Sequence, residues 1–114
     1  MQQENNWREM VPAVVATAGT IFHENGLASI VLPRYKNRWM IKLFVNEKRK
    51  NEIRLDLDEL GTAVWQQING ENSVQNILNN LHEIGETELQ FEERVIQFLS
   101  NLYRDKIITL RKAQ

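Results

Sequence analysis

The fold of this chain is decided by a stretch near its middle, which reads LDELGTAVWQQING (residues 57–70). Its apolar side chains recur every three or four positions, which is the period of a helix with one buried face. These side chains are Leu57, Leu60, Val64 and Ile68. Asp56 or Asp58 can cap the first turn, and Gly70 stands where a helix closes in the left-handed conformation. The stretch therefore predicts a helix that ends just before Gly70.

Two further helical stripes follow downstream. Ser73 is a favourable N-cap for the first, whose apolar side chains are Val74, Ile77, Leu78, Leu81 and Ile84. Thr87 begins the second, with Gln90 three residues later as in a capping box. The apolar side chains of that helix are Phe91, Val95, Phe98, Leu99 and Leu102. Residues 107–110 then predict a short strand.

Upstream of the opening stretch, the pattern is that of strands. Asn-Gly at positions 25–26 is a preferred centre for a two-residue hairpin turn, in which both central residues need positive φ. Apolar residues on both sides predict strands at about 18–24 and 27–32. Residues 53–57 alternate apolar and charged side chains, which predicts a third, half-buried strand.

Together these elements predict an α+β fold, with a three-stranded antiparallel sheet followed by a three-helix winged helix-turn-helix core. The length of 114 residues fits one domain. We place that domain at residues 20–110. Residues 1–19 are interpreted as an N-terminal arm that leads into the first strand, and residues 111–114 as a basic tail.

Charge is unevenly distributed along the chain. Residues 34–54 contain eight basic and two acidic side chains, a net charge of +6, whereas the whole chain carries −1 and the remainder therefore −7. The total excludes a uniformly basic nucleic-acid binder. The first half of the third helix, residues 87–94, has three carboxylates and one arginine, which would repel a phosphate backbone. Nucleic-acid binding through the basic segment 34–54 remains the alternative function. The total charge and the acidic start of the third helix disfavour it.

The sequence offers little material for catalysis. Cysteine is absent, which excludes disulfides and thiolate metal sites. We interpret His23 as a surface or cross-strand residue and His82 as part of the polar side of a helix, because neither has another ligand at metal-binding spacing. No phosphate loop or nucleophile motif is present. We therefore expect no enzymatic activity, no cofactor and no metal site.

Nothing in the sequence indicates a membrane protein. No stretch approaches the roughly 20 apolar residues that span a bilayer, and the first residues lack the layout of a signal peptide. We expect a cytoplasmic location and no membrane partner.

The third helix has an apolar extension on one side of its stripe. Ile96 and Tyr103 widen the stripe there, whereas Arg94, Gln97 and Asn101 on the other side are polar. Two interpretations stay open. The extension can pack beneath another part of the chain, or it can line a groove where an extended peptide adds to a sheet edge as a strand.

The order of these motifs resembles the coenzyme PQQ synthesis protein D (PqqD) family. The resemblance begins with Leu-Asp-Glu at 57–59, Val-Trp at 64–65 and Asn-Gly at 69–70. It continues with Ser-Val at 73–74 and with the later apolar motifs of the third helix and the strand after it. An upstream Val-Leu-Pro-Arg-Tyr at 31–35 is similar to a further element of the family. The resemblance covers about residues 20–110.

The resemblance implies a non-catalytic recognition element for ribosomally made, modified peptides. Such a module binds the leader region of a precursor peptide and presents it to a modifying enzyme, often a radical SAM protein. The implied peptide-binding residues lie on the last sheet strand and on the third helix. They are Glu52, Ile53, Arg54, Leu55, Ile96, Leu99 and Tyr103. Relative to compact members, the basic stretch 34–50 looks like an insertion, and a homodimer through the exposed strand is a further possibility.

Overall fold

The computed structural model describes residues 7–33, 52–82 and 88–112. The chain divides into two compact units, which we describe separately. Unit 1 is formed by Met1–Val15 together with Glu59–Gln114, and unit 2 by Ala16–Asp58. The basic stretch 34–50, with the nucleic-acid surface and the insertion expected there, lies outside the described residues. Of the eight basic residues in 34–54, only Arg54 is described.

Unit 2 has a three-stranded antiparallel sheet in the order β2-β3-β4. Its strands are β2 (Gly19–Phe22), β3 (Ala28–Pro33) and β4 (Glu52–Asp56). The three strands expected from the sequence are thus confirmed: β2 is shorter than expected, and β3 and β4 have the expected lengths but are each shifted by one residue. The buried residues of β3 include Ala28 and Ile30, whereas all four residues of β2 are exposed.

The turn between β2 and β3 differs from the expected two-residue turn. His23 N–H donates to Leu27 O (2.8 Å), and Gly26 N–H donates to His23 O (3.0 Å), so three residues form the loop. Only Gly26 has positive φ (+87°), and the Asn25 side chain accepts from Leu27 N–H instead. This is a turn followed by a left-handed glycine that forms a bulge, which the Asn-Gly pair alone does not distinguish from a two-residue turn.

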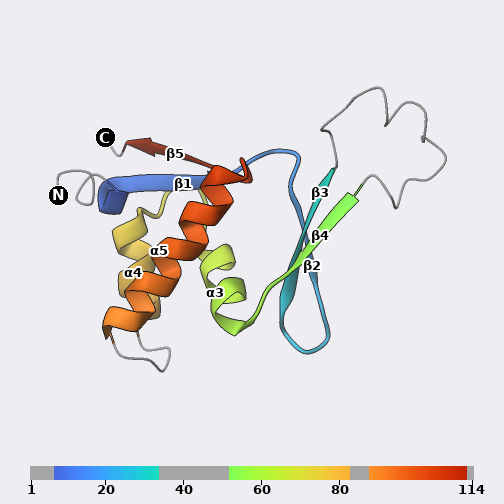
Figure 1. Cartoon of the computed structure of the whole chain (residues 1–114), viewed down its shortest axis with the longest axis horizontal. Coiled ribbons are helices and arrows are strands. Elements are labelled where there is room, and N and C mark those ends of the chain that lie inside the picture. Colours follow the sequence, from blue (N-terminus) through green and yellow to red (C-terminus); the bar gives the residue numbers. More distant parts are fainter. Residues whose placement is uncertain (1–6, 34–51, 83–87, 113–114) are drawn as a thin grey trace. The chain divides into compact units, whose positions relative to one another are not determined.

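The described part of unit 1 contains three helices of 8 residues or more and a second antiparallel sheet. The helices are α3 (Glu59–Gln67), α4 (Val74–Leu81) and α5 (Glu88–Arg104). The sheet pairs β1 (Met10–Val14) with β5 (Ile108–Lys112). Figure 1 shows the three helices gathered on one side of this strand pair. Among the described residues, no helix is long and apolar enough to cross a membrane.

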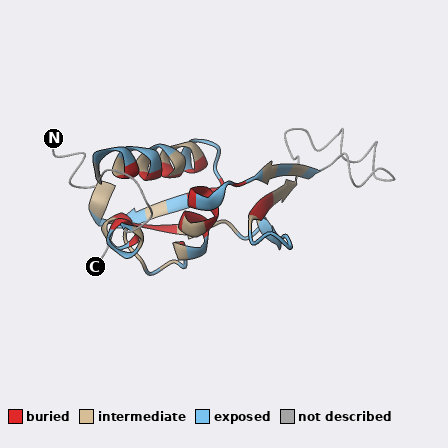
Figure 2. Ribbon diagram, turned by 90° about the horizontal axis from the view of Figure 1, so that it is seen from below, coloured by how far each residue is buried: buried red, intermediate tan, exposed pale blue. Residues whose placement is uncertain are grey.

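The helices follow the expected periodicity closely. Val64 in α3, Ile77 in α4 and Val95 in α5 are each 0% exposed and lie in the core. The Ser73 side chain accepts from Asn76 N–H (3.0 Å), which confirms it as the N-cap of α4. Gly70 has positive φ (+81°), as expected for the residue that follows α3. Figure 2 shows buried residues along one side of the long helix, with its other side exposed.

The β1–β5 sheet corrects the expected order of elements. We expected one sheet followed by helices, with residues 1–19 as an arm that only leads into a strand. Instead residues 10–14 form a strand that pairs with 108–112, nearly the full length of the chain away. A short helical turn at 7–9 precedes β1, and Arg8 binds Glu92 of α5 (2.8 Å) and Gln75 of α4 (3.0 Å). The protein is therefore an α+β fold with two separate antiparallel sheets.

The Ser29 side chain on β3 connects Asp56 of β4 with His23, the residue that follows β2. Its hydroxyl is buried and donates to Asp56 Oδ1 (2.6 Å). Since a hydroxyl has only one proton, Ser29 Oγ must accept from His23 Nε2, which lies 2.7 Å away. This places His23 as a cross-strand residue, as the sequence indicated.

We expect Ser29→Ala to lower the free energy of unfolding by about 0.5–1.5 kcal/mol, because it removes the hydrogen bond that the buried Ser29 hydroxyl donates to Asp56. Urea denaturation of the full chain measures this loss. In a double-mutant cycle with Asp56→Ala, the double variant should lose less stability than the sum of the two single losses, because both substitutions remove the same bond. Simple additivity would contradict the proposed connection.

Candidate functional site

The outer edge of β4 is the first part of the candidate site. β4 pairs only with β3 in the described sheet, in the register Val31↔Arg54. Leu57 N–H donates to Ala28 O (2.9 Å), so Ala28 and Leu57 form a hydrogen-bonded pair of the ladder. Hydrogen-bonded and non-bonded pairs alternate in an antiparallel ladder. The main-chain N–H and C=O of Glu52, Arg54 and Asp56 therefore point away from β3.

The side chains of β4 divide between its two faces. Ile53 and Leu55 are half-buried on one face, and Glu52, Arg54 and Asp56 are exposed on the other. The Arg54 side chain makes no hydrogen bond or ion pair with any part of the chain that the structure describes. A strand added at this edge would thus meet apolar side chains on one face and an unpaired guanidinium on the other.

The expected contribution of α5 needs one correction. Leu99 is 0% exposed and lies in the core of unit 1, so its side chain is not on a surface that a peptide can contact. Helical periodicity placed it in the apolar stripe but did not show how deep it lies. Ile96 is half-buried, and Tyr103 is 52% exposed. The accessible apolar surface expected on α5 therefore comes from Ile96 and Tyr103.

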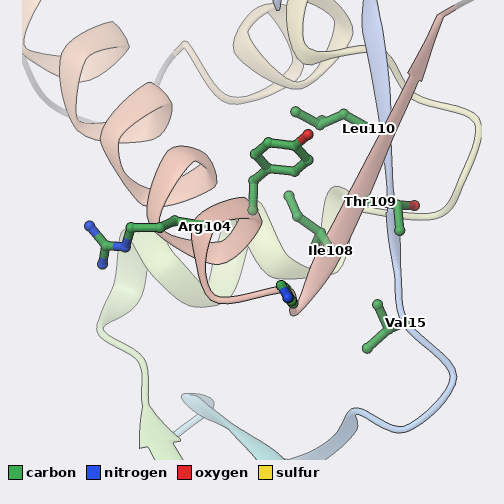
Figure 3. A pocket seen from close by; sticks show the side chains of 7 residues that line it. Val15, Arg104, Ile108, Thr109 and Leu110 are labelled. Carbon is green, nitrogen blue, oxygen red and sulfur yellow. The ribbon is translucent and has the colours of Figure 1, made fainter.

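Tyr103 also belongs to a hollow within unit 1. The hollow has a volume of about 630 Å³ and lies between the end of α5 and β5 (Figure 3). It is lined by Val15, Tyr103, Arg104, Lys106, Ile108, Thr109 and Leu110. No sequence pattern indicated this feature, because its lining brings Val15, which follows β1, together with the end of α5 and with β5.

The seven expected site residues are divided between the two units. Glu52, Ile53, Arg54 and Leu55 belong to unit 2, and Ile96, Leu99 and Tyr103 to unit 1. Each group lies together within its own unit. The groove expected between strand and helix stays a prediction. Sequence reasoning missed one residue of the edge, Asp56, whose outward main-chain groups follow only from the ladder register.

The remaining ionisable side chains that the structure describes do not assemble a metal site. Within residues 7–33, 52–82 and 88–112, no three His, Asp or Glu side chains are grouped so that they could hold a metal ion. His82 lies at the end of α4, where its Nδ1 is 2.8 Å from Asn79 O. This residue is exposed, in agreement with its expected place on the polar side of the helix.

A comparison with protein-family models provides the decisive observation. The model for coenzyme PQQ synthesis protein D (PqqD) matches residues 49–108, more than half of the chain and including all of β4 and the three helices. The chain belongs to the PqqD family. The resemblance found in the sequence motifs is thereby confirmed. No curated protein and no solved structure matched the chain.

PqqD proteins are associated with PQQ biosynthesis and act as peptide-binding accessory domains, generally without catalysis of their own. They bind a precursor peptide and cooperate with modifying enzymes. The open edge of β4 lies inside the matched range, as do Ile96 and Tyr103 of α5. The β1 strand and residues 109–112 of β5 lie outside it.

Proposed function

We propose that this PqqD-family protein binds the leader region of a ribosomally made precursor peptide as an added strand on the outer edge of β4. It presents that peptide to a modifying enzyme, such as a radical SAM protein, and has no catalytic role itself. The proposal retains the winged helix-turn-helix interpretation of α3, α4 and α5. It places the protein in the cytoplasm, where ribosomal peptides are released.

The observation that carries this proposal is the unpaired edge of β4 within the family-matched range. Main-chain groups of Glu52, Arg54 and Asp56 point outward, so an extended peptide can form a ladder there whatever its sequence. Selectivity then depends on side chains. Residues of the peptide that face Ile53 and Leu55 should be apolar, and a carboxylate opposite Arg54 should be favoured.

Charge also favours an acidic leader. Residues 34–54 carry a net charge of +6, and this segment ends with the first three residues of β4. Such a concentration of positive charge increases the rate at which an acidic peptide arrives, more than it increases the final affinity. The same segment carries the alternative of nucleic-acid binding, which no observation in the structure supports.

Amide hydrogen exchange tests the proposed edge directly. Synthetic leader peptides from short reading frames next to the gene are added to the ¹⁵N-labelled full chain. We expect the amide protons of Arg54 and Asp56 to exchange at least about tenfold more slowly when the peptide is bound, because they acquire an acceptor. The amides of Ile53 and Leu55 already bond to β3 and serve as internal controls.

Peptide binding that leaves the exchange at Arg54 and Asp56 unchanged would contradict the assignment to this edge. Failure of every neighbouring peptide to bind below high micromolar concentration would contradict the proposed function as a whole.

A further inference from the structure

The β1–β5 sheet has two outer edges, and they differ chemically. Val15 N–H donates to Ile107 O (3.0 Å), so the pairs Val14↔Ile108 and Pro12↔Leu110 are the non-bonded positions of the ladder. Their main-chain groups therefore point away from the partner strand. On β1 the outward positions include Pro12, which has no N–H to offer, and it stands between Met10 and Val14, whose N–H groups also point outward. On β5 the facing residue is Leu110, whose N–H and C=O are both present.

The hollow described above adjoins this open edge of β5. Figure 3 shows Ile108 and Leu110 on one face of the strand and Thr109 on the other, as alternation requires. Leu110 is half-buried, and Tyr103 from α5 is 52% exposed. An incoming strand would thus find main-chain partners on β5 and a hollow of about 630 Å³ beside them.

Positive charge surrounds the same edge. Residues 104–112 contain four basic side chains and one carboxylate, that of Asp105. Arg104 Nε lies 3.4 Å from that carboxylate, and Arg111 Nη2 donates to Gly70 O (3.0 Å). The side chains of Lys106 and Lys112 make no hydrogen bond or ion pair with residues that the structure describes. Among the described residues, these two cations beside the edge thus have no partner that would compete with an anionic segment.

Lys106 occupies a position that its side chain does not favour. Ile107 N–H donates to Leu102 O (2.9 Å) and Lys106 N–H to Tyr103 O (3.0 Å), which is the closing pattern of a helix that ends in a left-handed residue. Lys106 is that residue, with φ of +65°, and it is the only non-glycine residue with positive φ in the described part of the chain. Glycine is the usual residue at such a position. Replacement of Lys106 by glycine would therefore relieve strain in the backbone while it removes a cation beside the hollow.

We propose that the outer edge of β5 is a second strand-addition site, which takes an extended segment of alternating apolar and acidic residues from a partner protein. The apolar residues enter the hollow beside Tyr103 and Leu110, and the acidic residues pair with Lys106 and Lys112. This site is distinct from the peptide edge of β4, since β4 belongs to unit 2 and the hollow to unit 1. It also involves residues 109–112, which the PqqD family model does not match.

The test uses a synthetic peptide of four Val-Glu repeats and the ¹⁵N-labelled full chain. We expect chemical-shift changes at Leu110 and Lys112, slower exchange of their amides, and weaker binding as salt is added. A matched peptide of four Val-Lys repeats should bind at least fivefold more weakly. Lys106→Gly should reduce the affinity for the Val-Glu peptide at least threefold while raising the midpoint of thermal unfolding, and Lys106→Arg should restore the affinity.

The opposite behaviour of binding and stability in Lys106→Gly removes misfolding as an explanation for lost binding. Leu110→Pro is a second variant, since it removes the outward N–H of β5 as Pro12 does on β1, and it should also weaken binding. Equal affinity for the Val-Lys peptide, unchanged binding by Lys106→Gly, or shifts confined to Glu52, Arg54 and Asp56 would each overturn the β5 site. The last result would leave the proposed function of β4 intact.

Discussion

Replacement of Arg54 by proline should weaken binding of the leader peptide at least about tenfold while the sheet of unit 2 remains folded. The N–H of residue 54 points away from β3, so proline removes a donor that only the added peptide would use. The proline ring also occupies the space through which the peptide main chain approaches. Loss of one hydrogen bond together with this steric conflict corresponds to about 1.4 kcal/mol or more. Isothermal titration calorimetry with the neighbouring leader peptides measures the change.

Two matched variants separate the main chain from the side chain at this position. Arg54→Ala keeps the N–H and removes the guanidinium, so it should reduce affinity only a few-fold and mainly slow the association of acidic peptides. Ile53→Pro removes an N–H that faces β3 and should disrupt the sheet itself. If Arg54→Pro binds as well as the unaltered chain, or if Arg54→Ala loses as much affinity as Arg54→Pro, strand addition on β4 is wrong.

Replacement of Leu99 by alanine should lower the free energy of unfolding of the protein by about 2–5 kcal/mol. Leu99 is 0% exposed within unit 1, and its removal leaves a cavity in a core that includes Val95 and Leu102. A typical domain is stable by only about 5–15 kcal/mol, so this one change removes a large part of the total. Urea denaturation followed by circular dichroism measures the effect.

Tyr103→Ala is the control for the Leu99 variant. Tyr103 is 52% exposed on the same helix, so its truncation should cost much less stability. A Leu99→Ala protein of unchanged stability that binds peptide poorly would show that Leu99 contacts the peptide after all. A destabilised protein whose remaining folded fraction still binds peptide would support its role as a core residue.

Much of the fold could be predicted because it depends on local interactions. The N-cap at Ser73, the positive φ of Gly70 and the alternation of 53–57 are all properties of a few neighbouring residues. The motifs that identify the PqqD family lie in the same segments. The type of turn after His23 could not be predicted, because an Asn-Gly pair is compatible with more than one turn. The hydrogen bonds of the flanking residues decide between them.

The candidate site could be predicted only in part. Alternation in β4 correctly separated Ile53 and Leu55 from the charged residues of the other face. It could not show which main-chain groups are free, since that depends on the register with β3. Periodicity likewise placed Leu99 and Tyr103 near one another on α5, but the packing around the helix makes one a core residue and leaves the other exposed.

The sequence by itself determined the helices, the strands of unit 2 and the family, because each follows from side-chain patterns within short segments. Only the tertiary structure decided that residues 10–14 pair with 108–112, that Pro12 removes one donor from the outer edge of β1, and that Leu110 keeps its donor on the outer edge of β5. The physical reason is that a strand's free hydrogen-bonding groups are those its neighbour does not use. That neighbour can come from the opposite end of the chain, beyond the reach of any local pattern.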